Sequence, residues 1–261
     1  MPQAFKDKVV VITGGSRGIG RGIAVAFARE GAQTVLASSS EPNLAAAAKA
    51  VAAEGPAPIT VAGDLRKLEG CEQLFKQVND RFHRCDVLIN NAGATRAGNF
   101  TELPDDLWLD GFALKFFGAV RLTRLFWPLL KAAEGHVVNI IGGAARTVEP
   151  EFLIGGSVNA ATSNFTKGLS RLGMRDGVQV NAIHPGQTAT ERTEQLMQQR
   201  AAAQGKPIEA VRAESLAKSG TKRMSTPEDI AALTVFLCSE PARQIQGTAI
   251  AVDGGATPGL Y

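Results

Sequence analysis

Three spaced glycines near the amino terminus are the first residues in this chain whose spacing points to chemistry. Gly14, Gly18 and Gly20 follow an apolar run over residues 9–12 and precede an apolar-periodic stretch over residues 23–28. Between a strand and a helix, such glycines permit a tight turn and a close approach of backbone to a pyrophosphate. The first amides of the helix then face an anion. We therefore expect a dinucleotide to bind here, with these contacts: Gly14, Ser16, Arg17, Gly18, Ile19 and Gly20.

The end of the next apolar run, residues 33–37, indicates which dinucleotide binds. A carboxylate at this position would accept a hydrogen bond from the adenosine 2′-hydroxyl and would repel a 2′-phosphate. The chain has Ser38 and Ser39 there instead, and Arg17 adds a positive charge from the glycine loop. These residues favour NADP, with NAD as the alternative. A solvated serine turn beside an exposed arginine would also explain the pattern.

Alternating strands and helices must position these loops. The pattern predicts strands at residues 9–12, 33–37, 59–62, 87–89, 136–141 and 248–252, and helices at 44–53, 71–81 and 230–237. This alternation is typical of parallel pairing with right-handed crossovers, and so of a doubly wound α/β sheet with helices on both faces. Since ligands bind at the carboxyl ends of such strands, Gly14, Ser38, Asp64 and Asn91 should line one crevice.

Composition narrows the class of protein. The chain has 261 residues, 44% of them hydrophobic and 20% charged, with a net charge of +3, as in an ordinary globular protein. This charge is too small to predict a nucleic-acid partner. No apolar run is long enough for a membrane span or a signal peptide. The cysteines, Cys71, Cys85 and Cys238, are far apart, which predicts reduced thiols, no metal site and a cytoplasmic location.

Several motifs occur in one order along the chain. They are Thr13-Gly14-x-x-x-Gly18-x-Gly20, Asp64-Leu65, Asn90-Asn91-Ala92-Gly93, Val180-Asn181-Ala182-Ile183-x-Pro185-Gly186 and Val252-Asp253-Gly254-Gly255. Together they resemble the short-chain dehydrogenase/reductase family over residues 8–255. The resemblance implies a single Rossmann-type domain over 1–261 with seven parallel strands, a nicotinamide cofactor, a small-molecule substrate and a homotetramer or homodimer. It also implies further cofactor contacts at Leu65, Ala92, Gly93, Pro185, Gly186, Thr188 and Thr190.

The same resemblance locates the positions of the family's catalytic tyrosine, lysine and serine. Counting back from Asn181 by the family spacing gives Gly155 for the tyrosine and Asn159 for the lysine. The residue after the strand over 136–141 gives Gly142 for the serine. The only tyrosine in the chain is Tyr261, at its end, so no shift of register restores the phenol.

The fourth family residue, an asparagine, is replaced by a lysine. The spacing from Trp108 and to Gly118 selects Lys115. Where the family has asparagine and lysine, this chain thus has Lys115 and Asn159. We expect Lys115 to lie near the nicotinamide ribose, with a lowered pKa suited to proton transfer, and Asn159 to bond the ribose hydroxyls. The alternative is that Lys115 extends along its helix to solvent.

The two glycines have a different consequence. Gly142 and Gly155 are expected to leave open space beside the nicotinamide and to remove two donors that would polarise a substrate carbonyl. His184, just before Pro185, is a further candidate to approach the site.

Residues 190–222 follow the last cofactor motif, and the resemblance makes them a lid over the substrate. Their lysines and arginines outnumber four glutamates, which suggests an anionic substrate such as an acyl thioester; a solvated helical surface explains the balance equally well. Residues 112–127 are apolar on more than one face, which predicts a subunit interface.

Two main functions remain open. The first is an NAD(P)-dependent oxidoreductase acting on a carbonyl or alcohol substrate with a non-standard active site. The second is a protein that binds the nicotinamide cofactor without hydride chemistry, as a sensor or scaffolding subunit. An elimination or isomerisation enzyme is a third reading, but such an enzyme would have no need of the phosphate-binding glycines.

Overall fold

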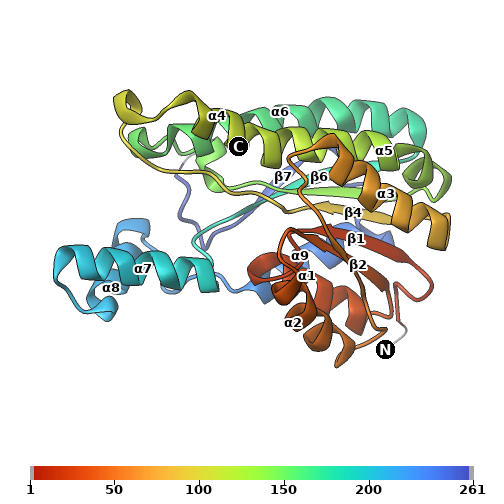
Figure 1. Ribbon diagram of the computed structural model, residues 1–261, viewed down its shortest axis with the longest axis horizontal. Coiled ribbons are helices and arrows are strands. Elements are labelled where there is room, and N and C mark those ends of the chain that lie inside the picture. Colours follow the sequence, from red (N-terminus) through yellow and green to blue (C-terminus); the bar gives the residue numbers. More distant parts are fainter. Residues whose placement is uncertain (1–2, 259–261) are drawn as a thin grey trace.

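A parallel sheet forms the centre of the molecule (Figure 1). The computed structural model describes residues 3–258, and within them seven strands pair in the order β3-β2-β1-β4-β5-β6-β7. The strands are β1 (Val9–Thr13), β2 (Gln33–Ser38), β3 (Ile59–Ala62), β4 (Val87–Asn90), β5 (His136–Ile140), β6 (Gln179–Pro185) and β7 (Ala249–Val252). The predicted doubly wound sheet is confirmed. Its strand order reverses between β1 and β4, so a crevice opens at their carboxyl ends.

Helices cover both faces of this sheet. One face carries α1 (Gly18–Arg29), α2 (Glu41–Ala52) and α9 (Pro227–Leu237). The other carries α3 (Leu68–Phe82), α4 (Asp105–Phe112), α5 (Gly118–Ala132) and α6 (Leu153–Asp176). Shorter helical segments are Phe100–Glu102, Gly143–Ala145, Pro150–Phe152 and Glu240–Ala242.

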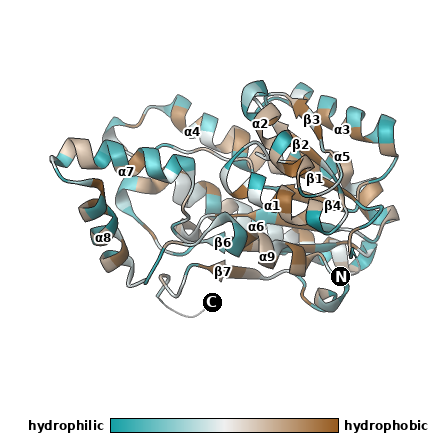
Figure 2. Cartoon of the chain, turned by 90° about the horizontal axis from the view of Figure 1, so that it is seen from below, coloured by the Kyte–Doolittle hydropathy of each residue, from teal (hydrophilic) through white to brown (hydrophobic). Residues whose placement is uncertain are grey.

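Two apolar clusters fill the space between the sheet and its helices. Val10 and Ile12 of β1 point into the cluster under α1, α2 and α9, while Val9 and Val11 point into the cluster under α3 and α5. This division follows from the alternation of side chains along a strand. Figure 2 shows the result, with hydrophobic residues concentrated along the strands and hydrophilic residues on outer helical turns. Burial on both faces explains why the strands have continuous apolar runs.

The start of α9 is fixed by a capping box. The Thr226 side chain accepts a hydrogen bond from the Asp229 amide at 3.4 Å, and Asp229 accepts one from the Thr226 amide at 2.7 Å. Pro227 occupies the first turn, where its missing N–H costs nothing.

The helices α7 (Glu191–Gln204) and α8 (Ile208–Ser219) project from the carboxyl edge of the sheet (Figure 1). An ion pair between Arg212 and Glu194 at 2.9 Å ties them together. A second pair, between Arg21 of α1 and Glu191 at 2.6 Å, joins α7 to the glycine-loop helix. None of the helices within residues 3–258 has the length and apolar character needed to cross a bilayer.

Between α4 and α5 the chain forms a π-helical turn, Ala113–Phe117, which the sequence did not predict. Such turns insert a residue into an otherwise continuous helix and change the direction of the side chains within the turn. Lys115 lies in the middle of this turn.

Candidate active site

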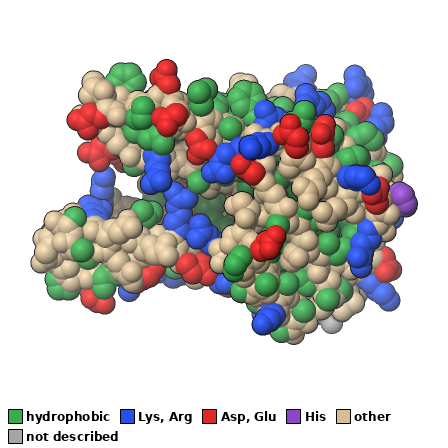
Figure 3. All heavy atoms as spheres, in the orientation of Figure 1, with side chains coloured by type: hydrophobic (Ala, Val, Ile, Leu, Met, Phe, Trp, Pro, Cys, Tyr) green, Lys and Arg blue, Asp and Glu red, His purple; other side chains and the backbone are tan. Residues whose placement is uncertain are grey.

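A pocket of about 560 Å³ lies at the carboxyl ends of the central strands. Figure 3 shows the corresponding hollow between the α7–α8 projection and the body of the protein. All of the predicted cofactor contacts line it except Gly20, which lies behind the loop. Lys115 and Gly142 also line it, whereas Gly155 and Asn159 do not.

The glycine loop forms one wall of the pocket, and its backbone needs glycine. Gly14 and Gly18 have φ angles of +64° and +52°, in the left-handed region that side chains disfavour. A Cβ on Gly20 would lie 2.2 Å from the Gly14 carbonyl oxygen. Because α1 begins at Gly18, the first amides of the helix are directed towards the pocket, as an anion-binding site requires.

Thr13 and Asn91 hold this wall rigidly. The Thr13 hydroxyl accepts hydrogen bonds from the Asn91 and Ala92 amides, at 2.9 and 3.0 Å, and donates to the Ile89 carbonyl at 3.2 Å. The Asn91 side chain donates to the Thr13 and Gly14 carbonyls, at 3.0 and 3.2 Å. These bonds join the end of β1 to the end of β4 before any ligand arrives.

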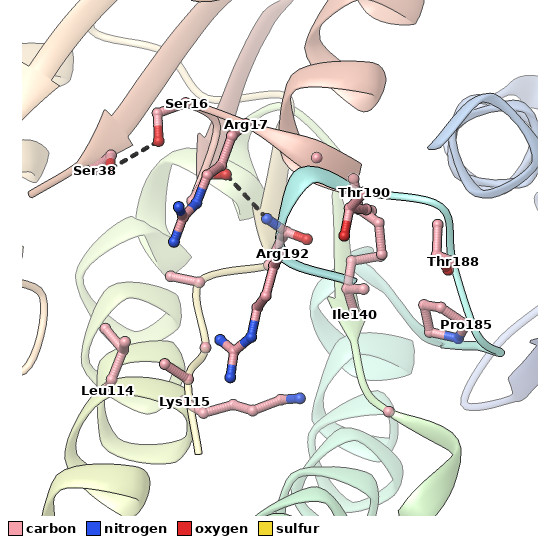
Figure 4. A pocket seen from close by; sticks show the side chains of 18 of the residues that line it. Ser16, Arg17, Ser38, Leu114, Lys115, Ile140, Pro185, Thr188, Thr190 and Arg192 are labelled. Atoms are coloured by element: carbon pink, nitrogen blue, oxygen red, sulfur yellow. Dashed lines mark hydrogen bonds between the residues drawn. The ribbon is translucent and has the colours of Figure 1, made fainter. Parts of the chain in front are cut away.

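Hydroxyl groups and an arginine lie where the sequence predicts contact with the adenosine ribose. Ser16 donates to Ser38 at 3.0 Å, as Figure 4 shows. The Arg17 side chain points into the pocket and has no ion-pair partner within residues 3–258. The acid at the end of β3, Asp64, is paired with Arg66 at 3.2 Å. The end of β2 therefore presents donors and no carboxylate.

Lys115 enters the same pocket from the π-helical turn. Its aliphatic chain passes over Gly93, where an added Cβ would lie 2.9 Å from the lysine Cδ. The side chain is partly buried, has no hydrogen-bond or ion-pair partner in the described part of the chain, and points towards the strand ends (Figure 4). Burial, assisted by the charge of Arg192, lowers the pKa of the Lys115 amine to about 8. Lys115 is thus directed into the pocket and not along its helix to solvent.

Asn159 has a different neighbour from the one we expected. Its amide packs on Gly142, where an added Cβ would lie 2.9 Å from Nδ2. The side chain is 3% exposed, and its Oδ1 has no partner among the described residues. The Asn159 amide therefore occupies the volume into which a side chain at residue 142 would extend.

A phenyl ring fills the corresponding place at Gly155. An added Cβ there would lie 2.1 Å from the Phe152 ring. Phe152 and Asn159 thus take up the volume directly next to the two glycines, while Gly142 still lines the pocket. The open space expected beside the nicotinamide stays a prediction. Tyr261 lies outside the described residues.

His184 lies beneath this end of the pocket. Its Nδ1 donates to the Gly142 carbonyl at 3.3 Å, which leaves Nε2 as an acceptor without a partner in residues 3–258. Burial lowers the pKa of the ring, so the neutral form predominates at neutral pH. The buried hydroxyl of Ser163 also lacks a partner there.

Sequence reasoning missed other residues that line the pocket. Among them are Arg66, Leu114, Ile140, Glu191, Arg192 and Thr193. Three of these flank residues that the sequence analysis selected, since Arg66 follows Leu65, Leu114 precedes Lys115 and Glu191 follows Thr190. Arg192 was noted only as one of the lid charges, and no motif in the sequence indicates that its side chain reaches Lys115.

The model of the family described as enoyl-(acyl carrier protein) reductase matches residues 14–257. An L-fucose dehydrogenase of Bos taurus is 34% identical, over 99% of this chain and 93% of its own length. A D-β-hydroxybutyrate dehydrogenase of Cupriavidus necator is 30% identical, over 96% of this chain and 98% of its own length.

A solved structure agrees closely in fold. The L-sorbose reductase of Gluconobacter frateurii, complexed with NADPH and L-sorbose, superimposes with a TM-score of 0.95. It is 32% identical in sequence, and the match covers 100% of both chains.

Proposed function

Because the chain belongs to the short-chain dehydrogenase/reductase family, we propose that it is an NADP-preferring oxidoreductase that interconverts a carbonyl compound and an alcohol with a lysine as proton donor. The observation that carries this proposal is the position of Lys115. An amine with a lowered pKa and no partner in residues 3–258 points into the pocket that the glycine loop lines.

The pocket fits a nicotinamide dinucleotide. Gly14 and Gly18 form a cradle that side chains would fill, since an added Cβ would lie 2.8 Å from Asn91 Nδ2 and 3.2 Å from Thr190 Cγ2. We propose that the loop amides and Thr190 hold the diphosphate, and that Ser38, Ser39 and Arg17 bind the 2′-phosphate. The NADPH complex of the L-sorbose reductase supports the NADP preference.

A bound reduced nicotinamide supplies the hydride that a carbonyl carbon accepts. The chain's own part is the proton. Lys115 Nζ gives a proton to the carbonyl oxygen as negative charge develops there, and the amine then regains one from solvent. With a pKa of about 8, the amine is mostly protonated at neutral pH and releases its proton more readily than an ordinary lysine.

Asn159 keeps a supporting role in this proposal. A bond from its amide to the ribose hydroxyls would require the side chain to turn from Gly142 towards the pocket. In the arrangement described above, Asn159 instead packs against Gly142 just after the end of β5, next to the point where the substrate would bind.

Phe152 favours the second candidate function, a cofactor-binding protein without turnover. Its ring occupies the space next to Gly155 and can donate no hydrogen bond to a substrate oxygen. If Lys115 gave no proton, the protein would bind the dinucleotide and act as a sensor or scaffold.

We also propose the domain organisation, lid and oligomeric state that the family resemblance implies, and the location that the sequence predicts. In this proposal the 1–261 domain is single, α7 and α8 act as its substrate lid, and the protein is cytoplasmic. Leu109 and Phe117, which are 71% and 45% exposed, would be covered in a homotetramer or homodimer.

The test combines an NADPH titration with a carbonyl panel followed by NADPH absorbance. We expect Lys115→Met to lower turnover by about 100-fold, as loss of a general acid does, while NADPH affinity stays within about threefold. Lys49→Met, which removes an exposed lysine of α2, is the matched control and should change neither. Tight NADPH binding with no turnover on the whole panel would favour the sensor instead.

A further inference from the structure

Two positive side chains converge on the substrate end of the pocket. Figure 4 shows Arg192 and Lys115 extending into it from opposite walls, one from α7 and the other from the π-helical turn. Figure 3 shows lysine and arginine side chains gathered around the same hollow. Besides Arg17 on the glycine loop, two positive charges therefore lie towards the Lys115 end of the pocket.

Arg192 has no carboxylate to neutralise it within residues 3–258. Its one hydrogen bond there goes from Nη2 to the Thr95 carbonyl at 3.4 Å, a long contact to a neutral group. The adjacent acid, Glu191, is already paired with Arg21 at 2.6 Å. Most of the donors of the guanidinium fork are thus left for another group.

The other pocket arginine near this end shows the contrast. Arg66 donates to Asp64 at 3.2 Å and to Asp110 at 2.5 Å, so its charge is balanced inside the protein. Arg192 and Lys115 have no such acids, and the charge of Arg192 opposes protonation of Lys115. An anion between the two would relieve this repulsion.

We propose that the substrate is an oxo acid, a carbonyl compound whose carboxylate binds Arg192 while Lys115 faces the neighbouring carbonyl oxygen. This inference rests on the proposed function for the role of Lys115 but not for the anion site. A planar guanidinium matches the two oxygens of a carboxylate, which gives a paired, charge-assisted contact. The carboxylate takes no part in the transfer of hydride and proton.

The diphosphate of the cofactor is the other source of negative charge in this pocket. It would lie on the amides at the start of α1, and Figure 4 shows the Arg192 side chain directed away from that loop and towards Lys115. Binding of the diphosphate by Arg192 is therefore the competing outcome of the test.

The test measures binding by calorimetry with saturating NADP⁺, so that no turnover is needed. The probes are pyruvate, 2-oxobutyrate, acetoacetate and 2-oxohexanoate, each beside its methyl ester. We expect at least one acid to bind about tenfold or more tightly than its ester. Arg192→Gln should lower the binding affinity for that acid by about 10- to 100-fold, which is the value of a charge-assisted pair, and leave the affinity for the ester unchanged.

Two further variants sharpen the result. Arg192→Lys keeps the charge but loses the fork, and should lose only part of the affinity for the acid. Arg200→Gln removes an equal charge from the same helix outside the pocket, and should behave as the native protein does.

The inference fails if no acid outbinds its ester, or if Arg192→Gln weakens NADP⁺ binding and leaves the acid-to-ester ratio unchanged. Separate outcomes identify failure of the proposed function. Acid binding without NADPH consumption would uphold the anion site and exclude the oxidoreductase. Turnover of neutral carbonyls, with no preference for acids, would uphold the oxidoreductase and exclude the anion site.

Discussion

The carboxyl ends of β1 and β4 and those of β5 and β6 lie on one sheet but differ in how their polar groups are satisfied. At the first pair, the Thr13 hydroxyl makes three hydrogen bonds and the Asn91 amide makes two, while Asn90 Oδ1 has no partner within residues 3–258. At the second pair, Asn159 Oδ1, His184 Nε2 and the Ser163 hydroxyl have no partner within residues 3–258.

The difference suggests a division of roles, in which the β1–β4 side supplies a rigid wall and the β5–β6 side supplies reactive groups. A buried polar group without a partner costs about 1–3 kcal/mol, so three such groups on the β5–β6 side destabilise it more than the single Asn90 Oδ1 destabilises the β1–β4 side. The β1–β4 side is held in shape by its own hydrogen bonds. The β5–β6 side keeps unused hydrogen-bonding capacity beside the pocket, where the substrate would bind.

The largest expected effect comes from breaking the rigid side. In Gly20→Ala, the new Cβ would lie 2.2 Å from the Gly14 carbonyl oxygen, so the loop must move. We expect the NADPH dissociation constant to rise by about 100-fold, measured by fluorescence titration. Gly168→Ala on α6, with nothing within 4 Å, is the control and should gain up to about 1 kcal/mol of stability. Native affinity in Gly20→Ala would contradict the assigned cradle.

The next effect concerns the pH dependence of the reactive side. The Lys115 amine has a pKa of about 8, so its protonated fraction falls above that pH. The rate of carbonyl reduction should be level below pH 8 and fall about tenfold per pH unit above it, while alcohol oxidation should rise through the same range. Lys115→Arg, which keeps its proton, should give a slow rate that is level across pH 8. A native profile that is level there would rule out Lys115 as the donor.

A stability comparison tests the contrast directly. Thr13→Val removes the acceptor for the Asn91 and Ala92 amides, and should lower the free energy of unfolding by about 1–3 kcal/mol in urea. Ser163→Ala removes a buried hydroxyl that has no partner among the described residues, and should change the free energy of unfolding by about 0.5 kcal/mol or less. Equal losses in the two variants would remove the distinction between the regions.

The smallest expected effect is the coupling between Gly142 and Asn159. Gly142→Ala places a Cβ 2.9 Å from Asn159 Nδ2 and should cost about 1 kcal/mol of stability. In an Asn159→Ala background most of this cost should vanish, as a double-mutant cycle would measure. Gly143→Ala, with its nearest atoms at 3.9 Å, is the control. If the stability losses of Gly142→Ala and Asn159→Ala were additive, the packing of the Asn159 amide would not depend on having a glycine at residue 142.

The sequence predicts the β1–β4 side far better than the β5–β6 side, and the reason is physical. The glycines at 14 and 18 and the serine at 38 act through backbone shape and strand position, which local spacing encodes. Arg192 acts through the direction of its long side chain in the pocket, and Phe152 through the contact of its ring with Gly155. That direction depends on helix phase and on neighbours distant in sequence, so no motif contains it.

The fold itself was predictable for the same reason. Buried β-branched runs identify strands such as β1 and β4, and their alternation with helices fixes parallel pairing. The π-helical turn was not predictable, because the sequence over 113–117 is equally compatible with an ordinary helix.

That turn makes the position of Lys115 vulnerable to a change that would improve the helix around it. Loss of one residue from Ala113–Phe117 would let α4 and α5 join as a continuous α-helix. The residues left within the turn would then take ordinary α-helical directions, while α4 and α5 on either side keep theirs. Because Lys115 lies inside the turn, the direction of its amine would change while the sheet and the glycine loop stayed as they are, so a single codon deletion tests the proposed proton donor apart from the proposed nucleotide site.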